Sequence, residues 1–281
     1  MSFFEMMANR IRRIPILKNL LRCIRDLFRP VYELVLKVLF PKGLLRTVDG
    51  LGRVYICHES RLHYVVPGDY EIPWWERLLQ EVREGDVIAD IGAYVGLFSI
   101  LLAKRTGNTG KVFVFEPNIF NFNLLKRNIG LNEVSERIEA YNMAISDREQ
   151  EVALVNKGPL SQVFFSVASS DSPLTKVKAQ SLDTLFGNSR LDILKIDIEG
   201  YEPYVIKGAT NLLKRKTGYP RFIFIECHPY AWKEFGINGN DSLITPLQEA
   251  GYKIDMSVLP DNIKLDDYRY PFPIFASRHT S

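Results

Sequence analysis

The chain has 281 residues, of which 46% are hydrophobic and 25% are charged, and its formal net charge at pH 7 is +3. This length suits one α/β domain of about 200 residues with an appended segment, and it argues against two full domains. The three cysteines, Cys23, Cys57 and Cys227, are odd in number and widely spaced, which argues against a disulfide framework and a paired-cysteine zinc site. We therefore expect a protein of a reducing, cytoplasmic compartment.

The positive charge is concentrated at the N-terminus. Residues 1–46 hold ten Lys or Arg against three Asp or Glu, and apolar residues recur there at helical spacing at Ile11, Ile14, Leu17, Leu20, Leu21, Ile24, Leu27 and Phe28. Charged residues interrupt every apolar run, so the segment is too polar to span a bilayer, and it does not resemble a signal peptide. We expect residues 1–44 to be a basic helical leader. It would pack on the domain or a second subunit, or lie on an anionic membrane at its inner face; an acidic partner is a further alternative, and no nucleic acid is expected.

Residues 45–84 are predicted to form a β-hairpin followed by a helix. Asp49-Gly50 is a typical hairpin turn between two alternating segments. The helix is expected from Pro73 to Val82, where it would act as a lid. Trp74 and Trp75 near its start either pack in the core or line a substrate pocket.

The segment Val87–Ile91 begins the third predicted region, residues 85–281. It reads as a strand buried on both faces, with Asp90 at its carboxyl end. Gly92 and Gly96 follow in a turn that would let a ligand approach the backbone, and free amide groups there would favour a polar or anionic ligand. The glycine spacing differs from the dinucleotide fingerprint, which disfavours a nicotinamide cofactor.

The next strand repeats this arrangement. Val112–Glu116 is apolar until its final acid, and Pro117 follows. An acid at the end of the second strand commonly holds a ribose in nucleotide-binding sheets. Asp90 and Glu116 together therefore indicate a nucleoside ligand, the alternative being that either acid is a helix cap or a solvated carboxylate.

Downstream, strands and helices alternate, which predicts a doubly wound, mostly parallel α/β sheet. Strands are expected over 138–144, 191–198 and 222–226, with helices between them. Residues 151–180 lack a helical period and are predicted to form a β-hairpin insertion lining the acceptor pocket. Two further strands, over 252–258 and 270–276, would complete an antiparallel edge.

Four motifs resemble the FkbM family of S-adenosylmethionine-dependent methyltransferases. They are Asp90-Ile-Gly-Ala-Tyr-Val-Gly96, Phe115-Glu-Pro117, Ser181-Leu-Asp-Thr-Leu185 and Leu194-Lys-Ile-Asp-Ile-Glu-Gly-Tyr-Glu202, the last followed by Lys207-Gly208-Ala209. The resemblance implies a seven-stranded, Rossmann-like methyltransferase sheet, S-adenosyl-L-methionine as methyl donor, and most often O-methylation of a hydroxyl.

The same resemblance suggests where the cofactor would lie. Its methionine end would meet Asp90, Gly92, Ala93, Tyr94 and Gly96, and Glu116 would hold the ribose. Asn118 would lie beside the adenine, which Met143 and Ala144 would cover. Asp147 could contact the adenine amino group.

Methyl transfer to oxygen also requires a group that accepts the hydroxyl proton. The candidates at strand ends are Asp197, Glu199, Glu226 and His228. Our preferred assignment gives Asp197 the acceptor or the amino-acid end of the donor and gives Glu199 the proton, although the two roles could be exchanged. Glu199 could instead cap the helix that follows, and His228 could be a loop residue.

No metal is expected at this site, although Asp197, Glu199 and Glu226 could hold a hard divalent cation that orients a diol. The predicted function is O-methylation of a hydroxyl on a sugar, glycolipid or secondary metabolite, and a homo-oligomer is one of the expected assemblies. The alternatives are N-methylation of a protein or small amine, and a non-catalytic adenosylmethionine-binding scaffold.

Overall fold

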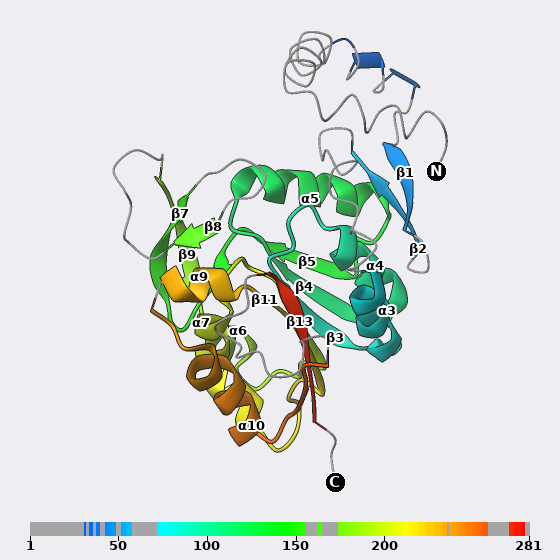
Figure 1. The fold of residues 1–281 in the computed structure, drawn as a ribbon. Coiled ribbons are helices and arrows are strands. Elements are labelled where there is room, and N and C mark those ends of the chain that lie inside the picture. The colour runs from blue at the N-terminus through cyan, green and yellow to red at the C-terminus, as the bar shows by residue number, and fades with distance from the viewer. Residues whose placement is uncertain are drawn as a thin grey trace, which may run out of the picture.

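A seven-stranded sheet forms the centre of the protein (Figure 1). The structure is a computed structural model and describes residues 31, 34–35, 38–39, 43–48, 52–57, 72–155, 162–164, 174–234, 236–257 and 270–278. In spatial order the strands are β12 (Lys253–Asp255), β13 (Phe272–Ser277), β11 (Phe222–Cys227), β10 (Ile193–Ile196), β3 (Val87–Ile91), β4 (Lys111–Phe115) and β5 (Ile138–Tyr141). Strand β13 is antiparallel to both its neighbours, and the other pairings are parallel. The predicted fold class, a doubly wound and mostly parallel methyltransferase sheet, is confirmed.

Helices cover both faces of this sheet. One face packs against α3 (Ile72–Glu81), α4 (Leu97–Arg105) and α5 (Ile119–Leu131). The other packs against α6 (Leu182–Phe186), α7 (Glu202–Lys207), α8 (Thr210–Lys214), α9 (Pro229–Glu234), the π-helix η3 (Asn240–Ile244) and α10 (Thr245–Glu249). The central strands are apolar on both faces because neither face meets solvent. Trp75 is 2% exposed and stacks on Phe98, so of its two predicted roles it has the packing one.

A second, four-stranded sheet lies at one end of the main sheet (Figure 1). It comprises β6 (Ala144–Ile145), β9 (Leu174–Gln180), β7 (Gln150–Val155) and β8 (Gln162–Phe164), in that order. Two predictions were therefore only partly right. The region predicted as a single hairpin over 151–180 contains three strands, β7, β8 and β9, and the strand predicted over 138–144 is divided into β5 and β6. The Asn142 side chain donates to the carbonyls of Glu116 and Pro117, both at 2.9 Å, and this bend separates β5 from β6.

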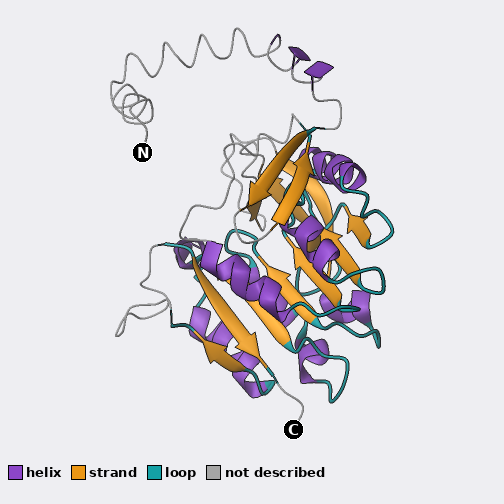
Figure 2. Ribbon diagram, turned by 90° about the vertical axis from the view of Figure 1, so that its right-hand side faces the viewer, coloured by secondary structure: helices purple, strands orange, loops and turns teal. Residues whose placement is uncertain are grey.

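The predicted hairpin is present as β1 (Leu44–Val48) and β2 (Gly52–Ile56), which pair antiparallel; its turn lies outside the described residues. It packs beside α4 and α5 (Figure 2). One asparagine within α5 and the asparagine that caps its C-terminus form hydrogen bonds with the backbone of β2 and of the residue after it. Asn132 accepts from the Tyr55 amide and donates to the Tyr55 carbonyl, and Asn128 accepts from the Cys57 amide at 2.7 Å.

Most of the basic leader, including the predicted apolar stripe from Ile11 to Phe28, lies outside the described residues. Five apolar side chains of its later part are described, each at least 46% exposed: Val31, Leu34, Val35, Val38 and Leu39. Among the described helices, none combines the length and apolar character needed to cross a membrane.

Candidate active site

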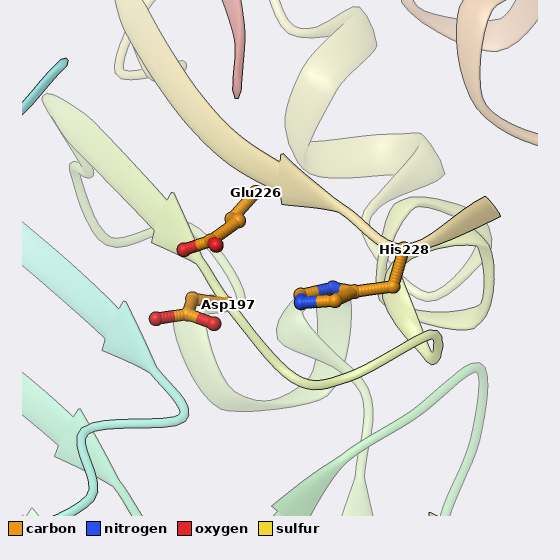
Figure 3. Close-up of side chains that lie close together, drawn as sticks. All are labelled: Asp197, Glu226 and His228. Carbon is orange, nitrogen blue, oxygen red and sulfur yellow. The ribbon is translucent and has the colours of Figure 1, made fainter. Parts of the chain in front are cut away.

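Three of the four predicted catalytic residues meet at the carboxyl ends of β10 and β11 (Figure 3). Successive side chains of a strand alternate between faces, so Lys195 and Asp197 share a face, as do Glu226 and His228. The parallel register pairs Ile196 with Ile225, which brings Asp197 beside Glu226. One ligand atom from each of Asp197, Glu226 and His228 lies within 4.8 Å of the other two.

A buried ion pair lies behind this cluster. Lys195 of β10 pairs with Asp90 of β3 in the parallel register. The Nζ atom of Lys195 lies 2.9 Å from Asp90 Oδ1 and 3.4 Å from Asp197 Oδ2. Nζ also donates to the Gly92 carbonyl, and the Ser99 hydroxyl donates to Asp90 Oδ2 at 2.6 Å. Burial alone would lower the pKa of Lys195, but Asp90 and Asp197 outweigh it and raise that pKa above its ordinary value. Lys195 is therefore a permanent cation in the core.

This arrangement changes the interpretation of Asp90. The residue was expected to contact the methionine end of the cofactor, but its side chain has no exposed surface. It lies within β3 rather than at its end, where it binds Lys195 and Ser99. In this structure Asp90 holds the lysine, and its contact with the cofactor stays a prediction.

The glycine turn after β3 is shaped by packing. Gly92 has φ = 81°, and a Cβ built there would lie 1.9 Å from the carbonyl oxygen of Asp197. Gly96 has φ = 85°, and its Cβ would lie 2.3 Å from Cδ1 of Leu125 in α5. Both positions need glycine because the backbone is left-handed and another part of the protein fills the space.

The amides of this turn are already hydrogen-bonded. Those of Gly92 and Ala93 donate to the Phe115 carbonyl at the end of β4, and that of Tyr94 donates to Glu116 Oε2 at 2.9 Å. The expectation of free amides for an anionic ligand was therefore wrong for these residues. Tyr94 itself has φ = 54°, a left-handed conformation that costs energy for a residue with a side chain.

Glu116 occupies the position that the sequence indicated, directly after β4. It is 6% exposed and accepts from the amides of Tyr94 and Asn118, each at 2.9 Å. Burial raises its pKa to about 7, although these hydrogen bonds act in the opposite direction. Its Oε1 also accepts from the Asn121 side-chain amide at 3.5 Å, whereas Oε2 can accept a second hydrogen bond, so the group can still receive a ribose hydroxyl.

The residues predicted near the adenine have structural roles here. Asn118 is the N-cap of α5 and accepts from the amides of Phe120 and Asn121. Ala144 is buried in β6, and Met143 is half-buried against the core. Their contact with a cofactor stays a prediction.

The predicted contact of Asp147 with adenine competes with an ion pair. Asp147 Oδ2 lies 3.0 Å from Lys207 Nζ; burial would raise the pKa of Asp147, but Lys207 outweighs it and lowers that pKa. The next residue, Gly208, approaches the small sheet so closely that a Cβ would lie 2.0 Å from the Ser146 carbonyl oxygen. Lys207 and Gly208 thus fasten the end of α7 to the small sheet.

His228 is held by a buried acid that the sequence analysis did not assign. Its Nδ1 lies 2.8 Å from Oε1 of Glu202, which is fully buried and also accepts from the Gly200 amide and the Trp232 indole. Burial alone would lower the pKa of His228, but Glu202, Glu199 and Glu226 raise it to about 10. In this state the imidazole is protonated at neutral pH, so it cannot serve as the proton acceptor.

Glu199 lies at the mouth of the cluster. Its side chain is 35% exposed, and its Oε2 accepts from the Tyr230 hydroxyl at 2.8 Å and lies 3.7 Å from His228 Nε2. The alternative role as a helix cap is not seen, because Tyr201 is the N-cap of α7 and makes no side-chain cap. Glu199 has φ = 58°, which marks a strained position of the kind found at functional sites.

Three residues of the site were thus missed as participants: Lys195, Glu202 and Tyr230. A signal existed for Lys195, since a lysine between isoleucine and leucine in a buried strand needs an acidic partner. Glu202 and Tyr230 give no such signal, because their contacts depend on how α7 and α9 meet.

Comparison with known proteins agrees with this architecture. The model of the methyltransferase FkbM domain matches residues 90–254, more than half of the chain. The chain belongs to the FkbM methyltransferase family. Adenosylmethionine is the cofactor of this family, in agreement with the predicted cofactor.

Two curated relatives of this FkbM protein are methyltransferases. The hexuronic acid methyltransferase AglP of Haloferax volcanii is 26% identical over 154 residues, which cover 54% of this chain. The methyltransferase sdnD of Sordaria araneosa is 25% identical over an alignment of 162 residues, with a coverage of 43% of this chain. In each case the match spans 59% of the relative's length. A solved adenosylmethionine-dependent O-methyltransferase of Thermotoga maritima aligns over 84% of this chain and 77% of its own, with 17% identity and a TM-score of 0.43.

Proposed function

We propose that this protein transfers a methyl group from adenosylmethionine to a hydroxyl oxygen of a sugar, glycolipid or secondary metabolite. The observation that carries the proposal is the group of carboxylates Asp197, Glu199 and Glu226 at the ends of β10 and β11, beside the turn that follows β3. A relative that acts on hexuronic acid supports a sugar acceptor.

The residues present fit the cofactor. Glu116 is nearly buried at the end of β4, and its Oε2, which accepts only from the Tyr94 amide among the described residues, has a lone pair left for a ribose hydroxyl. When bound, adenosylmethionine supplies an electrophilic methyl group on a positively charged sulfur. Asp197 and Glu226 give the neighbouring strand ends a negative potential, which favours that charge.

Glu199 is the proposed proton acceptor. Of the two carboxylates that contact His228 within the described residues, Glu199 is partly exposed and Glu202 is buried, and the Tyr230 hydroxyl holds Oε2 of Glu199. As the acceptor oxygen bonds to the methyl carbon, the carbon–sulfur bond breaks, its electrons stay on sulfur, and the hydroxyl proton passes to Glu199. Asp197 would hold the acceptor hydroxyl or the amino-acid end of the donor, because it projects from the adjoining strand end.

Calorimetric titration of adenosylmethionine and adenosylhomocysteine tests the cofactor site. We expect the wild-type protein to bind both, and Glu116→Gln to bind both more weakly because the amide group is neutral and its nitrogen, which replaces one carboxylate oxygen, cannot accept a hydrogen bond. Glu249→Gln, an exposed acid on α10, is the matched control. No binding to the wild-type protein would refute the proposal.

The chemical step is tested with labelled adenosylmethionine and a panel of acceptors led by uronic acid glycosides. Once a methylated product is found, Glu199→Gln and Asp197→Asn should each reduce its formation at least about 100-fold, while Glu249→Gln should not. If both variants form product at the wild-type rate, the assignment of these acids is wrong.

A further inference from the structure

We propose that Asp197, Glu226 and His228 form a binding site for one divalent transition cation, of the Mn²⁺ or Zn²⁺ class. The binding of the cation stands on the geometry alone. Its role, to hold and polarise the oxygens of the acceptor, rests on the proposed function.

The first argument is the convergence of donors. Asp197 follows β10, and Glu226 and His228 lie at the end of β11, yet one ligand atom of each lies within 4.8 Å of the others (Figure 3). Ligands of such a cation lie about 2.0–2.2 Å from it, so small side-chain rotations would bring all three into contact. Two carboxylates with one imidazole leave further positions open for water or acceptor oxygens.

The second argument is the orientation of the histidine. His228 is 2% exposed, its Nδ1 is bonded to Glu202, and Nε2 points toward Asp197 and Glu226 (Figure 3). Nε2 makes no hydrogen bond to any described residue, since the nearest charged atom, Glu199 Oε2, is 3.7 Å away. A carboxylate that binds the far nitrogen of a metal-ligating histidine is a general feature of such sites, because it fixes the ring and its tautomer.

The third argument is charge. Within the described residues, His228 faces Glu199, Glu202 and Glu226, and Asp197 adjoins them, whereas Lys195 is shared with Asp90. The surplus of carboxylates favours a cation of charge +2.

The imidazole also decides which cation fits. Mg²⁺ and Ca²⁺ prefer oxygen ligands alone, whereas Mn²⁺ and Zn²⁺ accept both carboxylate oxygen and imidazole nitrogen. Mn²⁺ is the better probe because free and bound ions give different paramagnetic resonance spectra.

The test is a titration of chelator-treated protein with Mn²⁺ alone, followed by paramagnetic resonance. We expect one Mn²⁺ per chain in the wild-type protein, and binding at least about tenfold weaker in Glu226→Gln and in Asp197→Asn. Glu202→Gln should also weaken binding, by about 10–100-fold, through the orientation of His228. Glu249→Gln should bind as the wild-type protein does.

Circular dichroism and a thermal melt show whether each variant is folded, and two separate ligand variants keep the test decisive if one is not. The cation site is refuted if the wild-type protein binds no Mn²⁺, or if both folded variants bind it unchanged. Adenosylmethionine titrated into the same samples reports on the methyltransferase function independently, because Glu116 and the turn after β3 supply none of the proposed metal ligands.

Discussion

Lys195 Nζ lies 2.9 Å from Asp90 Oδ1 in the interior of the central sheet, with side-chain exposures of 2% and 0%. Neighbouring parallel strands place the two residues side by side, so the pair joins the strand before the glycine turn to the strand before the proposed catalytic acids.

Removing one partner of this pair should be costly. Lys195→Ala leaves Asp90 as an uncompensated buried charge, and we expect the free energy of unfolding to fall by about 3–5 kcal/mol. Urea denaturation measures it. Lys176→Ala, which breaks an exposed pair with Glu151 at 3.6 Å, is the control and should change stability little. An equal fall in the free energy of unfolding in both variants would show that the buried pair stabilises the protein no more than the exposed pair does.

The ionisation of Glu116 predicts how stability depends on pH. Its pKa is about 7 in the folded protein against an ordinary value of 4.5, so the folded state binds the proton more tightly. The stabilisation from this proton is complete below about pH 4.5 and is lost as pH rises through about 7, with a total of about 3 kcal/mol. Unfolding at pH 5 and at pH 8 should show this loss in the wild-type protein and its absence in Glu116→Gln.

Affinity for adenosylmethionine should depend on pH in the opposite direction. Ribose hydroxyls donate to the ionised carboxylate, so binding should strengthen by up to about tenfold between pH 6 and pH 8. Calorimetry at the two pH values measures this change. A profile that persists unaltered in Glu116→Gln would place the titrating group elsewhere.

Gly92 and Gly130 should respond oppositely to alanine. Gly92→Ala adds a Cβ 1.9 Å from the Asp197 carbonyl oxygen at a left-handed position, and we expect a loss of about 1–3 kcal/mol or more. Gly130 lies in α5 with nothing within 4 Å of its Cβ position, so Gly130→Ala should raise stability by about 0.5–1 kcal/mol. Thermal melts of the two variants compare these effects; a stable Gly92→Ala would contradict the close approach.

Tyr230→Phe tests whether Glu199 must be held in place. The hydroxyl lies at the surface, so its loss should change the free energy of unfolding by about 1 kcal/mol or less. The turnover number should fall roughly tenfold, less than the fall expected for Glu199→Gln, while KM for the acceptor stays near its wild-type value. An unchanged turnover number would show that Tyr230 does not position Glu199.

The sequence was sufficient for the central sheet because its strands are buried on both faces. The runs at Val87, Ile193 and Phe222 are almost entirely apolar, with Asp90, Lys195 and Glu226 as the exceptions, and such runs are typical of the central strands of a parallel sheet. The small sheet was underestimated, since β6 has two residues and pairs with β9, some thirty positions later. No local pattern encodes such a pairing.

The candidate site was also predicted in part from the sequence, and the rest depends on contacts between distant segments. Asp197, Glu226 and His228 were predicted from their positions at strand ends, and the register of β10 and β11 brings them together. Asp90 was misread because a strand end and the penultimate residue of a strand look alike in sequence. The distinction depends on Lys195, which only the paired strands place beside it.

The short helix α7 links two parts of the protein that would otherwise be independent. Asp197 and Glu199 precede its first turn, while at its far end Gly208 approaches the Ser146 backbone and Lys207 binds Asp147. The small sheet therefore cannot slide past α7 without disturbing the turn that carries the acids. A substitution in the small sheet that shifts the backbone at Ser146 should therefore also displace the proposed catalytic acids, although it lies outside the candidate site.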